Sequence, residues 1–129
     1  MLADAATAIE GKFYIHGGGL TKVTPPRLPW LQPLAICIDL EVQELDRDSQ
    51  HRIEITVFGP DHEVLTGPDL HPFTAPRPVD LAEGEKPAFH VAMTHNGLTL
   101  KEVGPHVIRV VLDDREQIDL PFAVTHQRS

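Results

Sequence analysis

The chain contains one cysteine and two serines, and these shortages limit the reactions that it can support. Cys37, as the only cysteine, cannot form a disulfide within the chain and leaves no thiolate cluster for a structural zinc ion. Ser49 and Ser129 both lie outside any Gly-x-Ser-x-Gly motif, the turn that presents the nucleophilic serine in many hydrolases. We therefore predict that the chain is not an enzyme and has no catalytic residue, no metal ligand and no cofactor.

Basic residues and long apolar runs are scarce as well. Lysine and arginine number 11 against 19 acidic residues, for a net charge of −8, and they form no block, so we expect no nucleic-acid partner. Apolar runs stop at about five residues, as in 34–38, whereas a membrane-spanning helix needs roughly 20. The first residues lack the basic and apolar regions of a secretory signal. We expect a cytoplasmic protein with no membrane partner.

Alternation of apolar and polar residues with a period of two is the strongest pattern present, and it is typical of half-buried strands. It is clearest over 34–42 and recurs over 53–57, 89–94, 107–112 and 118–125. No segment keeps helical spacing of apolar residues beyond a weak start at 3–9. The sequence predicts one all-β domain over 1–129. We expect a two-layer antiparallel β-sandwich, immunoglobulin-like or C2-like, with about seven to nine strands and little helix.

The same pattern predicts which side chains face the core and where the chain turns. The inward residues of the two most regular segments are Leu34, Ile36, Ile38, Leu40 and Val42, then Ile118, Leu120, Phe122 and Val124. Turns are expected at 10–11, at 59–62 and at 113–116. The first of these turns would join residues near 3–9 to residues near 12–16 as a hairpin.

Two proline-rich stretches interrupt the alternation. Residues 24–33 and 68–78 hold eight of the 12 prolines, and because proline cannot donate to a central ladder, both are predicted to be edge or crossover segments. The first has a PxxP form that polyproline-binding domains recognise. It supplies our candidate partner surface, which consists of Pro26, Arg27, Pro29 and Trp30. The alternative is that Trp30 packs onto the core of its own domain.

Histidines and glycines offer a competing, enzymatic interpretation. His16 and the glycines at 17–19 have the form of an oxyanion loop, although without a nucleophile we expect the glycines to allow a bulge or a positive φ where a strand leaves the sheet. The eight histidines are never closer than five positions, so the local spacings of common metal sites are missing. Distant histidines such as His90, His95 and His106 could still converge after folding.

Acidic residues gather between positions 39 and 48, but this stretch does not match a calcium-binding loop because His51 stands where glycine is required. A calcium site in which Asp46 and Asp48 join Asp113, Asp114 and Glu116 stays open as an alternative. Charge runs usually keep a loop solvated, and that is our prediction here.

Several motifs together resemble a known family of small proteins. The motifs lie at 2–6 (LADAA), 11–15 (GKFYI) and 17–19 (GGG), and near the other end at 104–110 (GPHVIRV) and 120–124 (LPFAV). They resemble an uncharacterised bacterial family, common in actinobacteria, that is catalogued as a domain of unknown function. Residues 113–116 depart from it, because a turn containing glycine is expected there. The resemblance implies a compact β-domain and supplies no catalytic residues.

These observations favour a non-enzymatic binding or accessory module that acts through protein–protein contacts or self-association. Two alternatives stay open. One is a hydrolase or metal-dependent enzyme that uses the His16–Gly19 loop together with histidines. The other is a carrier that holds a small molecule between the sheets, for which the sequence names no ligand.

Overall fold

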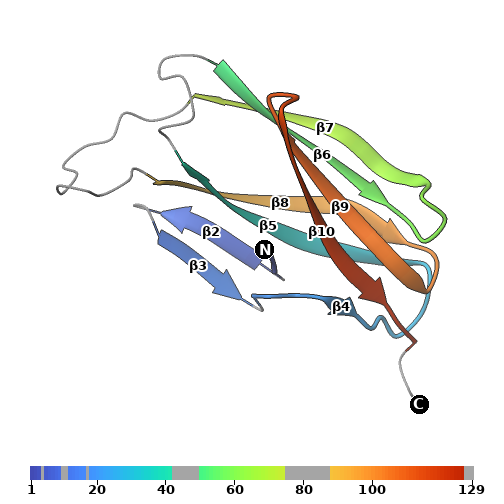
Figure 1. Ribbon diagram of the computed structural model, residues 1–129. Coiled ribbons are helices and arrows are strands. Elements are labelled where there is room, and N and C mark those ends of the chain that lie inside the picture. The colour runs from blue at the N-terminus through green and yellow to red at the C-terminus, as the bar shows by residue number, and fades with distance from the viewer. Residues whose placement is uncertain (4, 10–11, 17, 42–49, 75–87, 127–129) are drawn as a thin grey trace.

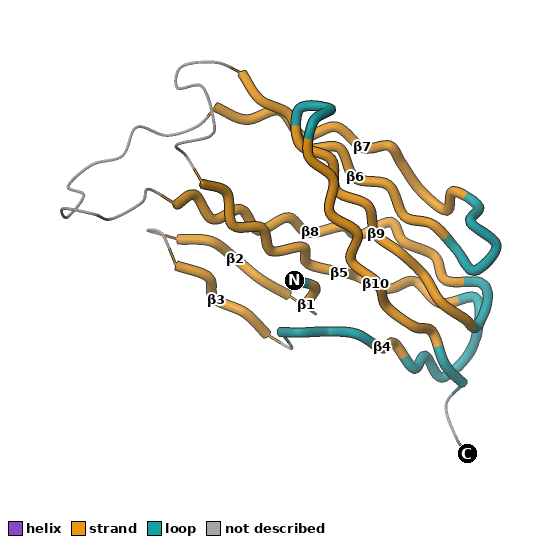
Figure 2. Tube along the Cα trace, in the orientation of Figure 1, coloured by secondary structure: helices purple, strands orange, loops and turns teal. Residues whose placement is uncertain are grey.

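The computed structural model describes residues 1–3, 5–9, 12–16, 18–41, 50–74 and 88–126, and within them every regular element is a strand (Figure 2). The strands are β1 (Leu2–Ala3), β2 (Ala5–Ile9), β3 (Lys12–His16), β4 (Lys22–Val23), β5 (Trp30–Glu41), β6 (Gln50–Phe58), β7 (Val64–Thr74), β8 (Ala88–Leu100), β9 (Gly104–Leu112) and β10 (Glu116–Val124). The predicted all-β class is confirmed. The two-residue strands β1 and β4 are too short to leave a periodic signal in the sequence.

The strands form two main sheets and a separate hairpin (Figure 1). One sheet has the order β4-β10-β9-β6-β7 and the other has the order β1-β5-β8. Among the described strands, β2 pairs with β3 alone. All pairings are antiparallel except that of β4 with β10. The predicted hairpin between residues near 3–9 and near 12–16 is confirmed over 5–9 and 12–16, with Ala5 opposite His16 and Ile9 opposite Lys12, whereas Ala3 pairs with Ala35 on β5. Its turn at 10–11 lies outside the described residues.

The core lies between the two main sheets. Its buried members from the sheet containing β5 are Leu2, Leu34, Ile36, Ile38, Leu98 and Leu100, and those from the sheet containing β9 are Val23, Ile53, Ile55, Val57, Ile108, Val110, Phe122 and Val124. Each fully buried aliphatic side chain contributes on the order of 1.5–3 kcal/mol, so apolar burial stabilises the layered arrangement. Alternation in the sequence therefore identified most of the described core.

Strand β5 departs from simple alternation at its centre. Leu34, Ile36 and Ile38 face the core as predicted, but Ala35 and Cys37 are buried as well, at 0% and 5% exposure. Both faces of this segment are therefore covered, and β2 is a described element that contacts both β5 and β8. The expectation of a half-buried strand is wrong over 34–38, because small side chains on the second face leave room for a covering segment. The side chains of 39–42 lie outside the described residues.

Ile118 is the other exception to the inward pattern. It was predicted to face the core, but it is 53% exposed, whereas Phe122 and Val124 on the same strand are buried. The reason is that β4 pairs with β10 only at Ala123 and Val124. The first half of β10 is therefore a sheet edge without a covering neighbour among the described residues.

Most of the turns and proline-rich segments lie where the sequence predicted them. Residues 59–62 connect β6 to β7, and the Gly59 backbone N–H donates to the Glu63 carbonyl at 2.9 Å. β7 carries Pro68 and Pro72 and is an edge strand, as expected. The first proline-rich stretch is a crossover only up to position 29, because Trp30 begins β5, and Pro33 sits at a register shift between Gln32 and Leu34. A proline is tolerated at such an irregularity because no regular ladder bond is lost there.

The positive φ predicted for the glycines after β3 is found at Gly19. β3 ends at His16, and Gly19 has a φ of 73°, a backbone conformation that favours glycine. Gly17 and the side chain of His16 lie outside the described residues. The segment then hydrogen-bonds both sheets, since the Leu20 N–H donates to the Leu2 carbonyl at 2.9 Å and the Ala123 N–H donates to the Thr21 carbonyl at 2.9 Å.

Candidate functional site

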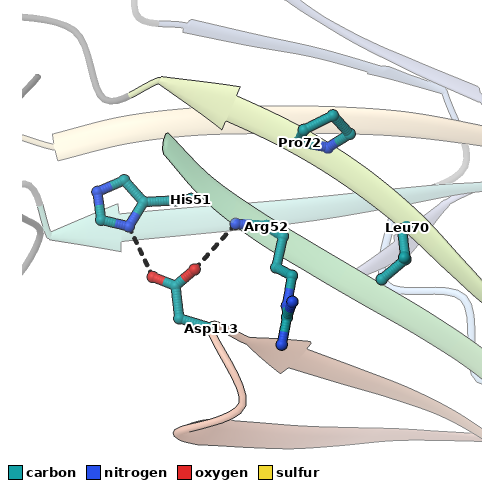
Figure 3. Close-up of a pocket in the computed structure, with 5 residues that line it drawn as sticks. All are labelled: His51, Arg52, Leu70, Pro72 and Asp113. Atoms are coloured by element: carbon teal, nitrogen blue, oxygen red, sulfur yellow. Dashed lines mark hydrogen bonds and ion pairs between the residues drawn. The ribbon is translucent and has the colours of Figure 1, made fainter. Parts of the chain in front are cut away.

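A cavity of about 410 Å³ opens where β6 and β7 meet the β9–β10 turn (Figure 3). It is lined by His51, Arg52, Leu70, Pro72 and Asp113. Arg52 lies opposite Pro72 in the β6–β7 ladder, so both side chains lie on the outer face of the sheet. His51 precedes Arg52 on the same strand and points to the inner face, where it is 7% exposed.

Asp113 connects the β9–β10 turn to β6 through both of its carboxylate oxygens. Its Oδ2 lies 2.6 Å from His51 Nδ1, and its Oδ1 accepts a hydrogen bond of 2.9 Å from the Arg52 backbone N–H. The Asp113 backbone N–H in turn donates to the Arg52 carbonyl at 3.1 Å. Both carboxylate oxygens are thus engaged within the fold.

Two opposing effects act on the pKa of Asp113. Burial disfavours the charged form and acts to raise the pKa. The hydrogen bond from the Arg52 backbone lowers the pKa, as do the hydrogen bond and charge of His51 and the charge of Arg115, and these lowering effects combined exceed the effect of burial. The net effect holds the pKa of Asp113 below its ordinary value of 3.8. Asp113 is therefore a carboxylate that fastens the turn to β6 and is not poised to exchange protons near neutral pH.

The turn itself explains why this carboxylate occurs here. Asp113 and Asp114 are the first two of the three residues between the paired Leu112 and Glu116, and they have positive φ values of 51° and 58°, at which glycine or asparagine is usual. The hydrogen bonds of Asp113 to β6 and the ion pair of Asp114 with Arg52 offset the backbone cost. The lack of a glycine at 113–116 was thus a sequence signal for this contact, although it did not identify His51 as the partner.

Replacing Asp113 with asparagine is expected to lower the free energy of unfolding by about 1–3 kcal/mol near pH 7, because charge-assisted hydrogen bonds are lost. Since the pKa of Asp113 is lower in the folded state, its contribution is complete above the ordinary carboxyl value of 3.8 and disappears as the pH falls through the folded value. Urea unfolding of both proteins over a range of pH should therefore show their stabilities converging in acid. A difference that stays constant across the range would contradict the assignment.

Asp61→Asn is the matched control for that measurement. Asp61 is exposed in the β6–β7 turn, and its side chain makes no hydrogen bond with any described residue. The substitution removes the same charge, and its effect on stability should stay within about 0.5 kcal/mol at every pH.

The histidines of the enzymatic alternative are placed in different surroundings. His106 is buried, its Nδ1 lies 2.9 Å from the Gly104 carbonyl oxygen, and its ring stacks on Phe122. His95 lies beside Asp69, with 3.8 Å between His95 Nδ1 and Asp69 Oδ2. The side chains of His16 and His90 lie outside the described residues. Across the residues that the structure describes, no group of three or more His, Cys, Asp or Glu side chains is placed to hold a metal ion.

The calcium alternative rested on carboxylates from two loops. Asp113 and Asp114 are engaged by His51 and Arg52 on β6, as described above. Asp46 and Asp48 lie outside the described residues. Glu116 begins β10 and is exposed, and no three described carboxylates come together as a metal site.

The candidate partner surface, hereafter the crossover surface, lies between β4 and β5 and consists of Pro26, Arg27, Pro29 and Trp30. The first three are exposed. Trp30 is partly buried against the core, and its Nε1–H donates to Gln32 Oε1 at 3.0 Å. Trp30 thus packs on its own domain, as the alternative interpretation had it, while its neighbours stay accessible.

A second cavity, hereafter the crossover groove, borders this surface. It measures about 230 Å³ and is lined by Leu20, Lys22, Val23, Thr24, Pro25, Pro26, Trp30 and Gln32. The groove joins an apolar lining to one ammonium group, a combination that suits a partner with both apolar and charged groups. Periodicity could not have predicted the groove, because it forms where β4 packs beside the start of β5.

The chain is thus an all-β protein built from two mostly antiparallel sheets with the core between them. It belongs to the family described as "Family of unknown function (DUF6941)", whose model matches residues 1–125. The resemblance to an uncharacterised domain family is confirmed at that level. Neither a curated protein nor a solved structure matches the chain. Among the described residues, none forms a helix with the length and apolarity needed to cross a membrane.

Proposed function

We propose that the domain is a non-enzymatic module that binds another protein through the crossover surface. The observation that carries this proposal is the exposure of Pro26, Arg27 and Pro29 around Trp30, beside an open groove whose lining mixes polar and apolar side chains. Tryptophan and arginine dominate the energetic centres of protein interfaces. The prolines restrict the backbone before binding, so less conformational entropy is lost when a partner docks.

Other parts of the molecule offer less to a partner. Asp113, which lines the cavity in Figure 3, already holds the β9–β10 turn to β6. β7 is a sheet edge, but Pro68 and Pro72 lack the N–H groups that an added strand would need. These features favour recognition by side chains on the crossover surface over pairing of sheet edges.

Native mass spectrometry of the protein captured from the cells that produce it tests the proposal. We expect a second chain bound to the native protein and absent from the double variant R27E/W30S. Because Trp30 contacts the core, the variant R27E/P26S changes only exposed side chains and should also lose most of the bound chain. Circular dichroism establishes that each variant is folded.

The control variant R115E/L70S alters one arginine and one exposed apolar residue outside the crossover surface and should keep the partner. The proposal is wrong if the native protein carries no second chain. It is also wrong if R27E/W30S and R27E/P26S retain that chain while folded.

A further inference from the structure

The charges of this acidic chain are unevenly distributed. Residues 11–38 contain no aspartate or glutamate, yet they carry three of the 11 lysines and arginines, at positions 12, 22 and 27. The chain as a whole has a net charge of −8. The crossover surface and the crossover groove both belong largely to this acid-free stretch, so they form a local cationic region on an anionic protein.

Two of these cations have no anionic partner in the described structure. Arg52 pairs with Asp114 in the β9–β10 turn, and Arg109 pairs with Asp119 on the neighbouring strand β10. No ion pair joins Lys22 or Arg27 to any described carboxylate. Both side chains are exposed, and Lys22 lines the groove itself, so their charges are available to a molecule that docks there.

The apolar part of the groove adjoins the core, which contains Val23 and against which Leu20 and Trp30 pack. Leu20, Val23 and Trp30 line it. Trp30 pairs with Leu100 on β8, and the two described charged residues that follow Leu100, Lys101 and Glu102, have opposite signs. An apolar side chain could bury its surface against Trp30 while flanking carboxylates reach Lys22 and Arg27.

We infer that the partner presents an acidic segment interrupted by an apolar side chain, which occupies the crossover groove. This inference rests on the proposed function and specifies the chemistry of the partner. A protein segment fits better than a nucleic acid, because the net charge of −8 repels an extended phosphate backbone outside this small region. The unpaired Lys22 and Arg27 supply the electrostatic complement, and Trp30 supplies the apolar contact.

Fluorescence of Trp30, the only tryptophan, reports binding at the groove directly. The probes are a short peptide of Asp, Glu and Leu, the same peptide with Lys in place of every acid, and the acidic peptide with Ser in place of Leu. We expect the first peptide to shift the Trp30 emission and the other two to bind at least about tenfold more weakly, which corresponds to about 1.4 kcal/mol. Binding of the first peptide should also weaken as salt is raised.

The variant K22E/R27E distinguishes recognition of the peptide's charge from nonspecific binding. It should bind the acidic peptide at least about tenfold more weakly, while R115E, which reverses a charge at the far β9–β10 turn, should bind as the native protein does. Equal binding of the acidic and lysine peptides, or undiminished binding to folded K22E/R27E, would overturn the inference. So would a Trp30 shift caused by phosphatidylserine vesicles or single-stranded DNA when the acidic peptide causes none.

The two proposals fail differently. If R27E/W30S loses a partner that the native protein captures from cells, but the acidic peptide does not bind, then the proposed function is supported and the inference of an acidic partner is wrong. If the native protein captures no partner, the proposed function itself is wrong.

Discussion

Ile36→Asp is expected to abolish cooperative folding. Ile36 is 1% exposed in the core, between Leu2 on β1 and Met93 on β8. The substitution removes apolar burial worth about 1.5–3 kcal/mol and places a carboxylate among apolar core side chains, where burial of its charge costs several kcal/mol more. Together these losses rival the total stability of a small domain, which is about 5–15 kcal/mol. Circular dichroism during urea titration should show no sigmoidal transition.

Leu31→Asp tests whether the effect depends on position along the same strand. Leu31 is 59% exposed, so the same substitution there should change the free energy of unfolding by no more than about 0.5 kcal/mol. Ile36→Val, which deletes only one methyl group, should cost about 0.5–1.5 kcal/mol and keep the transition measurable. A folded Ile36→Asp protein with native strand content and a cooperative transition would show that the core is assigned wrongly.

Gly67→Ala should destabilise the domain by about 3 kcal/mol, through backbone strain and overpacking together. Gly67 has a φ of 101°, and an added Cβ would lie 2.5 Å from the Ile55 carbonyl oxygen and 2.9 Å from Thr56 Cα. Both neighbours are backbone atoms of β6, next to a register shift in the β6–β7 ladder, so no flexible side chain can move aside. The midpoint of urea unfolding should fall accordingly.

Gly19→Ala separates the two causes. Gly19 also has a positive φ, 73°, but an added Cβ there would meet nothing within 4 Å. The control should therefore show only the conformational cost of about 1–2 kcal/mol. Equal losses for the two variants would mean that the close approach of β7 to β6 at Gly67 contributes nothing.

The class of fold was accessible from the sequence because a strand that covers a core must alternate its side chains. Ile53, Ile55 and Val57 are buried as the period of two requires. The same rule misassigned Ile118, since alternation gives the face of a strand but not whether a neighbouring strand covers that face. It also missed the second buried face of β5, because Ala35 and Cys37 are small residues that occur in covered and open positions alike.

The candidate sites were less accessible because each depends on residues far apart in the chain. His51 and Asp113 are separated by 62 positions, and nothing local in the sequence connects them. Trp30 and Arg27 were identified because the prolines mark a segment outside the regular ladder. Their groove was not identified, since it forms between residues 20–26 around β4 and the start of β5, two segments that belong to different sheets.

The segment through β4 spans the layers of the molecule. Its Leu20 N–H bonds to β1 in one sheet, while the carbonyls of Thr21 and Val23 accept hydrogen bonds from Ala123 and Thr125 beside the other (Figure 1). The segment therefore links the two sheets along one flank, and the sheets cannot separate there without breaking these hydrogen bonds. A molecule bound against Lys22 and Val23 would contact this segment from the outside of the domain. Binding there would therefore stabilise the two sheets against separation.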